Sequence, residues 1–408
     1  MHIRPILSTL ARHKTAAALI ILEVAISCAI LCNALFIVSQ RLSAITQPSG
    51  MDDKHLVMLR ASGIGQVDQA LARTQEDLAA LRAIPGVSSA TIVNQLPFQG
   101  SAWNTSISTA PNGEGTMVNA AQYNLAPGSL QTLGLPLVAG RGQSNEDFYT
   151  PDEIGQRMQS GEGLQLSLMI SQELADKLFP EGNAVGKSLY MGPYPLTVIG
   201  VTGTLKRPNS SFGAMEYSLM MPVHISYADG GIYVLRVDNP ALREEVMQAA
   251  NDVLIKRDPN RLVRPPQTFE QQRENYFSAD RDMVGLLIVV SVLLLLVTAL
   301  GIVGLASFWV GQRTKQIGIR RALGATRGQV LQYFLTENAL LVSGGIVIGM
   351  LMTYGLNQWL MSTYSLPRLP LYFLPAGALT LWALGLLSVW GPARRASLIP
   401  PAVATRSA

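Results

Sequence analysis

The sequence predicts an α-helical membrane protein with four transmembrane helices, arranged 1 + 3, and a large mixed α/β domain between the first and second helices. Three observations predict this class: four long apolar runs, one long polar segment after the first run, and basic residues gathered in the short flanks of the runs. Of the 408 residues, 48% are hydrophobic and only 14% are charged, whereas soluble domains average about 25% charged residues. The shortage of charge is confined to the runs, which excludes a purely soluble protein.

Each apolar run is long enough to cross a bilayer, because about 20 helical residues span the hydrocarbon core. The second run carries no charge, and at roughly 1.5 Å per residue it is long enough to continue beyond the bilayer as a stalk. The first run is longer than the apolar core of a signal peptide, about 7–15 residues, so we expect it to remain as a span. The runs cover residues 15–38, 283–310, 339–360 and 372–390, and a short external loop, 361–371, joins the last two.

Basic residues indicate which ends of the runs face the cytoplasm. The segments 1–14, 311–336 and 391–408 together hold eleven Lys or Arg and no Asp or Glu. Because short loops rich in Lys and Arg stay on the cytoplasmic side, both termini and the 311–336 loop are predicted to lie in the cytoplasm. Segment 39–282 then lies outside. Its residues 41–282 carry 19 basic and 25 acidic side chains, which argues against nucleic-acid binding.

The external segment alternates strand and helix patterns and ends in a polar helical stalk. Apolar positions near a 3.6-residue period predict a helix over 67–84, and strict alternation predicts a strand over 231–238. Residues 97–163 are rich in Gly, Pro, Asn and Ser, which predicts mostly loops. Cys28 and Cys32 both lie in the first apolar run, where we expect them to be small packing residues, so the external domain holds no disulfide.

Catalytic and metal-binding signals are sparse. The four histidines are scattered without metal-ligand spacing, and the patterns HExxH, GxSxG and CxxC are absent, so neither a catalytic nor a metal site is predicted. Residues 182–188, GNAVGKS, resemble a phosphate-binding loop but have three residues between the glycines instead of four. We interpret this stretch as a turn that leads into a strand, so the chain is expected to have no ATP site of its own.

The most distinctive polar segment is Arg313–Gln329, RTKQIGIRRALGATRGQ, which joins the second and third runs. It carries five basic residues and no acid. Its apolar residues are spaced for a short amphipathic helix: Ile317, Ile319, Ala322 and Leu323. A short helix held at the membrane surface between two spans can transmit movement from a soluble partner into those spans. This segment is therefore the predicted functional site.

Two further features lie inside the apolar runs. Glu23 is a carboxylate two to three helical turns from the cytoplasmic end of the first run, and an intramembrane carboxylate is costly and often functional. It can stay neutral, pair with a positive group of a neighbour, or reach toward the interface; a structural or inter-subunit role is favoured over transport. Gly345 and Gly349 permit close helix approach, either within the bundle or at a dimer face.

These features together resemble the MacB/FtsX-like permease family of type VII, mechanotransmitting ABC systems. The family loop, R-T-R-E-I-G-I-R-R-A-L-G-A-T, matches Arg313–Thr326 except at a few positions, and PARRA near the C-terminus matches Pro392–Ala396. The external domain resembles the MacB-type periplasmic core through residues 127–141. The resemblance implies a coupling helix that contacts a cytoplasmic ATPase, with these residues in it: Arg313, Gln316, Ile317, Gly318, Arg320, Arg321, Ala322, Leu323, Gly324 and Ala325.

The resemblance also implies the partners and cofactors. ATP and Mg would be bound by a separate ABC ATPase dimer, with no cofactor in this chain, and a second permease copy would complete the complex in the bacterial inner membrane. Gln316 stands where the family usually has Glu, which suits one half of a heterodimer, although a homodimer remains open. The leading hypothesis is a MacB-like exporter, with a periplasmic adaptor and an outer-membrane channel as further partners. The alternatives are an FtsX-like permease that activates a periplasmic partner and a lipoprotein-releasing permease.

Overall fold

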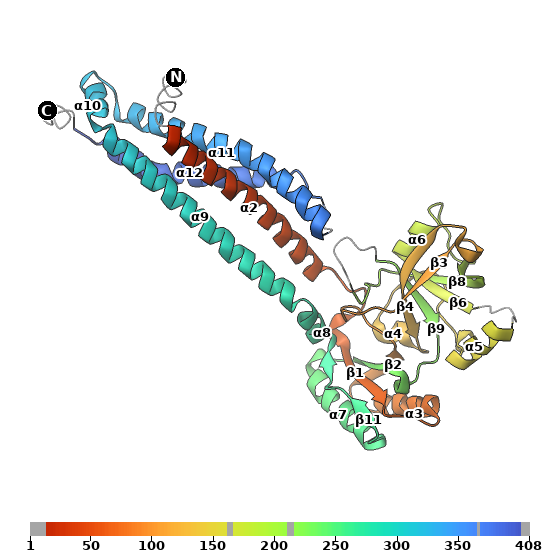
Figure 1. Cartoon of the computed structure of the whole chain (residues 1–408). Helices are drawn as coiled ribbons and strands as arrows, with labels where there is room; N and C mark the ends of the chain where they lie inside the picture. Colours follow the sequence, from red (N-terminus) through yellow and green to blue (C-terminus); the bar gives the residue numbers. More distant parts are fainter. Residues whose placement is uncertain (1–13, 161–165, 210–215, 365–367, 401–408) are drawn as a thin grey trace. The chain divides into compact units, whose positions relative to one another are not determined.

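The computed structural model describes residues 14–160, 166–209, 216–364 and 368–400. The chain forms two compact units, shown in Figure 1: a helical unit from Met1–Thr46 and Ala279–Ala408, and an α/β unit from Gln47–Ser278. Residues 1–13 of the predicted cytoplasmic N-terminus and residues 401–408 of the predicted tail lie outside the described residues. Residues 365–367 of the predicted external loop lie outside them as well.

The helical unit contains four helices that are long and apolar enough to cross a membrane, counted over the described residues. One precedes the α/β unit in the chain and three follow it, as the four apolar runs predict. A fifth, short helix, α10 (Thr314–Ala322), connects the second and third of them. The four long helices are α2 (Lys14–Thr46), α9 (Ser278–Gln312), α11 (Arg327–Tyr364) and α12 (Phe373–Ser397).

Small residues bring α11 close to α2. A Cβ atom added at Gly349 would lie 2.8 Å from the carbonyl oxygen of Ala25 and would clash with Cys28. Gly345 faces Val24 in the same way, one turn away. The two glycines therefore pack within the bundle rather than leaving a free dimer face. Cys28 and its neighbour on the next turn are fully buried, which confirms that they are packing residues.

The α/β unit contains twelve strands within the described residues, in one mixed sheet with the order β11-β1-β10-β2-β4-β3-β7-β8-β6-β9. Strand β12 pairs with β1, and β5 pairs with β8. The strands are β1 (Leu56–Gly63), β2 (Val87–Val93), β3 (Asn104–Ser108), β4 (Met117–Leu125), β5 (Leu137–Gly140), β6 (Leu166–Ser171), β7 (Ser188–Met191), β8 (Tyr194–Thr202), β9 (Ser218–Pro222), β10 (Ile232–Val237), β11 (Arg261–Val263) and β12 (Gln267–Thr268).

The sheet has two parts, because β9 also pairs in parallel with β4 and so closes six strands into a ring. All six ring strands contribute to one apolar core, for example through Ile107, Val118, Leu168, Leu189, Val198 and Leu219. The remaining strands bury a second core beneath α3 (Ala70–Arg82) and α7 (Arg243–Arg257). The other helices of this unit are α4 (Ser129–Leu133), α5 (Pro151–Ser160), α6 (Gln172–Leu178) and α8 (Phe269–Tyr276).

The predicted elements of this unit are largely confirmed. The helix expected over 67–84 is α3, and the strand expected over 231–238 is β10. Residues 182–188 form a turn between α6 and β7, which confirms the interpretation of GNAVGKS. The stretch 97–163 is more ordered than predicted, since it holds β3, β4, β5 and α5. Most of its described glycines lie in the turns between these elements, whereas Asn104, Asn119 and Asn124 lie in β3 and β4, so composition alone does not reveal the short strands.

A buried polar network fixes the second core. Asp77 of α3 accepts hydrogen bonds from Arg261 of β11 at 2.5 Å and from the hydroxyl of Tyr233 at 2.7 Å. The Tyr227 hydroxyl donates to Asp258 at 2.6 Å, which holds the pKa of that carboxyl below its ordinary value. Both side chains of the Asp77–Arg261 pair are 1% exposed. A buried charge without its partner is strongly destabilising, so this network joins α3 to β11 in one arrangement.

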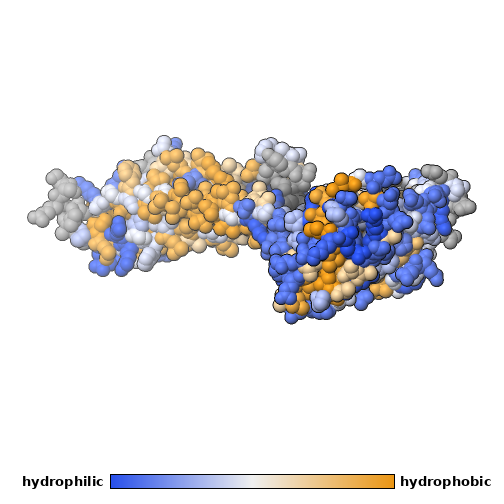
Figure 2. All heavy atoms as spheres, turned by 90° about the horizontal axis from the view of Figure 1, so that it is seen from below, coloured by the Kyte–Doolittle hydropathy of each residue, from blue (hydrophilic) through white to orange (hydrophobic). Residues whose placement is uncertain are grey.

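The surfaces of the two units differ as a membrane protein requires. Figure 2 shows apolar side chains over the helical unit, whereas hydrophilic side chains dominate the visible face of the α/β unit. The apolar residues of α9 are more than half exposed at many positions, such as Leu286 and Leu300, each 63% exposed. Such a surface is stable only against lipid or another apolar helix.

Candidate functional site

The helix α10 begins without a capping side chain and is followed by a glycine. Arg313 forms the link from α9, and Gly324 follows the last turn with a φ of +97°, in the left-handed region that favours glycine. The next helix begins with a capping box, in which the Thr326 hydroxyl accepts from the Gln329 amide and the Gln329 side chain accepts from the Thr326 amide. The basic loop therefore folds as one helix held between two sharp turns.

The apolar residues of α10 lie on two faces rather than one. Ile317 is buried in the helical core at 5% exposure, and Gly318 is buried beside it. In contrast, Ile319 is 47% exposed and Leu323 is 83% exposed, and Ala322 is exposed between them. One face thus anchors α10 to the bundle, and the other presents apolar side chains with no described residues covering them.

A buried ion pair holds the start of α10. The Arg313 guanidinium donates through Nη1 to both carboxylate oxygens of Glu337 in α11, each at 2.9 Å. The Arg313 side chain is 8% exposed and that of Glu337 is 2% exposed. The guanidinium also lies 5.6 Å from the ring centroid of Trp309 in the last turns of α9. Arg313 therefore ties three helices together at one point.

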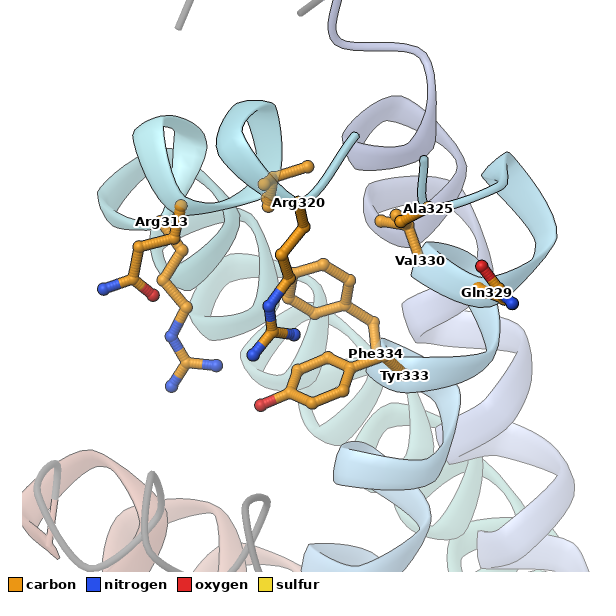
Figure 3. Close-up of a pocket in the computed structure, with 9 residues that line it drawn as sticks. Arg313, Arg320, Ala325, Gln329, Val330, Tyr333 and Phe334 are labelled. Atoms are coloured by element: carbon orange, nitrogen blue, oxygen red, sulfur yellow. The ribbon is translucent and has the colours of Figure 1, made fainter. Parts of the chain in front are cut away.

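A cavity of about 150 Å³ lies between α10 and the first turns of α11, shown in Figure 3. Besides Arg313, its main lining residues are Gln316, Ile317, Arg320, Val330, Tyr333 and Phe334. The Arg320 guanidinium lies 4.9 Å from the ring centroid of Tyr333. Figure 3 shows the guanidinium groups of Arg313 and Arg320 pointing to the same side of α10. Ala325 of the predicted coupling segment lines this cavity as well.

The two basic sequence motifs meet at this end of the bundle. Arg321 of α10 donates to the carbonyl oxygen of Ile399 at 2.5 Å, just beyond the end of α12. The PARRA motif forms the last turns of α12, and its two alanines are buried. The ten residues predicted for coupling therefore lie together on α10 and its two flanks. Their role in contacting an ATPase stays a prediction.

Glu23 lies away from this cluster, inside α2. Its carboxylate packs against Gly301 of α9, at a point where any added side chain would clash. One turn further along, the Ser27 and Thr298 hydroxyls share a buried hydrogen bond of 2.8 Å between the same two helices. Among the described residues, no cation forms an ion pair with Glu23. The placement makes Glu23 part of the α2–α9 contact.

Sequence reasoning missed the α11 side of the site. Glu337, Tyr333 and Val330 lie outside the basic loop motif, and their helix reads as the beginning of an apolar run. One signal was available, because Glu337 is the only acid in the last 126 residues after Asp282. A lone acid that follows five basic residues predicts an ion pair, although not which arginine it binds.

Comparison with known proteins agrees with the residue patterns. Residues 17–253 match the family described as MacB-like periplasmic core domain, and residues 288–401 match that described as FtsX-like permease C-terminal. The chain is 26% identical over 298 residues to the macrolide export ATP-binding/permease protein MacB of Chromobacterium violaceum, covering 70% of this chain and 43% of that protein. It is 24% identical over 349 residues to the uncharacterized ABC transporter permease YknZ of Bacillus subtilis, covering 82% and 79%.

The periplasmic region of MacB from Actinobacillus actinomycetemcomitans matches 57% of this chain and 97% of that one, with 15% identity and a TM-score of 0.33. The chain spans less than half the length of the MacB relative from Chromobacterium violaceum, and both matched families describe permease regions. Since the periplasmic core match alone covers more than half of the residues, the chain belongs to the MacB/FtsX-like family of ABC transporter permeases.

Proposed function

We propose that this chain is the permease subunit of an ABC exporter and that a separate ATPase subunit docks on α10. The observation that carries the proposal is the pair of faces on this helix. Its inner face is fixed to the bundle by Ile317 and by the Arg313–Glu337 pair, while Ile319 and Leu323 are exposed. A partner protein can bind the exposed apolar face. Because the other face is fixed to the bundle, movement of that partner would move the bundle as well. ATP and Mg would be bound by that partner.

Movement of α10 has a direct route along the chain. Helix α9 is continuous from Ser278 to Gln312, about 50 Å at 1.5 Å per residue, and its first residue is the last residue of the α/β unit. At the far end from α10, Arg41 of α2 pairs with Asp280 of α9, so the two helices that connect to the α/β unit are joined. We expect α9 and α2 to act as a lever that reshapes the periplasmic domain.

A matching clamp lies inside the α/β unit. Arg273 of α8 donates to Asp53 at 2.9 Å and to the carbonyl oxygen of Gln47 at 2.5 Å. Residues 47 and 273 stand near the two points where the chain enters and leaves this unit. The clamp holds those two segments side by side, so a shift of one is passed to the other.

The wider assembly follows from this role. Eleven basic residues in the three short segments favour cytoplasmic termini and a cytoplasmic α10, which puts the α/β unit in the periplasm. A second permease copy, identical or paralogous, would cover exposed α9, and a periplasmic adaptor with an outer-membrane channel would complete the exporter. Because MacB relatives are named for macrolide export, a macrolide is the first substrate to test.

The test is to change the exposed face of α10 without changing its anchor. The full chain is co-expressed with its ATPase, and Leu323→Asp is compared with Gln332→Asp, which adds the same charge at an exposed position on α11. We expect Leu323→Asp to abolish copurification of the ATPase and macrolide export from cells, while Gln332→Asp retains both. Normal ATPase binding by Leu323→Asp would show that α10 is not the docking element.

A further inference from the structure

The cavity between α10 and α11 is lined by two guanidinium groups and by apolar side chains. We propose that it binds the phosphate group of an anionic phospholipid from the cytoplasmic leaflet, between the guanidinium groups of Arg313 and Arg320. The proposal concerns the lining of this cavity, which does not include Ile319 or Leu323. It depends on α10 lying at the membrane surface and does not depend on which protein docks there.

The first argument is an unsatisfied cation. Arg313 is 7% exposed and lines the cavity, but its Nη2 atom has no hydrogen-bond partner among the described residues. Among the described residues, its acidic partner is Glu337, which is bound through Nη1. A buried guanidinium nitrogen without an acceptor is unfavourable, so a ligand oxygen in this cavity would satisfy it.

The second argument is the surplus of positive charge around the cavity. Arg320 adds a second guanidinium, stacked on Tyr333. No acid occurs between Asp282 and Glu337 in the sequence, and Glu337 is already paired with Arg313. A planar guanidinium binds phosphate oxygens through two parallel N–H groups. A pair of guanidinium groups therefore fits one phosphate, which has more acceptor oxygens, better than it fits one carboxylate.

The third argument is the direction of the groups. Figure 3 shows both guanidinium groups pointing the way that α11 descends from Gln329, toward the long apolar helices. Tyr333 lies beside Arg320, and aromatic residues of this kind are enriched at the level of the lipid head groups. Because α10 connects two long apolar helices, a lipid can reach this cavity laterally from the membrane.

The apolar part of the lining fits the rest of a lipid. Ile317, Val330 and Phe334 form one wall and are each less than 8% exposed. This wall can contact the glycerol and the first methylene groups, while the Tyr333 hydroxyl is placed to donate to the phosphate. A soluble phosphate would use only the polar side of the cavity. The two sources of the same group are therefore distinguishable by experiment.

The experiment measures lipid binding to the delipidated full chain in detergent by native mass spectrometry. Phosphatidylglycerol, phosphatidylcholine and inorganic phosphate are titrated separately. We expect the tightest site to prefer phosphatidylglycerol, and Arg320→Gln to weaken that site about fivefold or more, since each basic residue near a membrane surface contributes about that factor. Arg320→Lys should recover part of the affinity. Arg327→Gln removes the same charge from an exposed position of the same loop and should leave the site unchanged.

A second measurement identifies the occupant in membranes. A photo-crosslinking amino acid at Gln329, which lines the cavity, is activated in cells that also produce the ATPase, and we expect the label on phospholipid. Label on the ATPase alone would overturn the proposal in favour of a protein occupant. Equal effects of Arg320→Gln and Arg327→Gln, or saturation by inorganic phosphate without lipid preference, would also overturn it. Retained ATPase copurification by Arg320→Gln would separate this site from the docking face.

Discussion

The ion pair between Arg313 and Glu337 gives the sharpest quantitative prediction. Both carboxylate oxygens lie 2.9 Å from Nη1, and the side chains are 8% and 2% exposed. Two charges about 4 Å apart interact by about 4 kcal/mol at an effective dielectric of 20, and removing one partner of a buried pair costs about 3–5 kcal/mol. We therefore expect Arg313→Leu and Glu337→Leu each to destabilise the helical unit by about that amount.

The double variant distinguishes the interaction energy of the two charges from the effect of placing leucine at these two positions. Replacing both residues by leucine leaves no unpaired buried charge, so the double variant should be far more stable than the sum of the single variants predicts. Hydrogen exchange of residues 313–337 and thermal unfolding of the full chain in detergent measure this difference. Arg327→Leu, at an exposed position, is the control and should change stability by less than about 0.5 kcal/mol. Additive single variants would refute the reasoning, because additivity means that the two charges do not interact.

Two further predictions concern packing and acid stability. Gly349→Ala should destabilise the α2–α11 contact by about 1–3 kcal/mol, because the new methyl meets the backbone of α2, whereas Gly355→Ala meets nothing within 4 Å and should be neutral in the same thermal unfolding assay. The Arg141 guanidinium holds the pKa of Asp147 well below its usual range. The Arg141–Asp147 pair contributes its full stability above the unfolded pKa of Asp147, about 3.9. That stability is lost as the pH falls from this value through the lower pKa of the folded state. Acid unfolding of the α/β unit, followed by hydrogen exchange, should thus be less pH-dependent in Asp147→Asn; identical pH profiles would contradict this.

The sequence predicts those features that depend on local patterns. Four runs of apolar residues become four long helices, and strict alternation over 231–238 becomes β10, because burial on one or both faces needs only a short-range pattern. The motif Arg313–Thr326 likewise locates α10. Its amphipathic spacing, however, treats Ile317 and Ile319 as one face, and tertiary packing places them on opposite sides.

Features that join distant segments could not be predicted in this way. Closure of the strand ring depends on a parallel pairing between β4 and β9, about 100 residues apart, such as Tyr123 opposite Met220. No periodicity in either strand specifies that partner. The same holds for Glu337, since its helix reads as apolar, and only the fold places its carboxylate beside Arg313 rather than beside another arginine of the loop.

Under the proposed function, polar contacts between helices determine how a force on α10 would be distributed. Three of them join different pairs of helices: Arg313–Glu337 joins the start of α10 to α11, Ser27–Thr298 joins α2 to α9, and Asn338 of α11 donates to a backbone carbonyl of α12 at 2.9 Å. Hydrogen bonds between membrane helices average only about 0.6 kcal/mol, so they set register more than they stabilise. The Arg313–Glu337 pair is more deeply buried than the Arg41–Asp280 pair, and it lies where α10 begins. We therefore expect a pull on α10 to be resisted first at Arg313 and to reach both α9 and α11 before the hydrogen bonds between the other helices break.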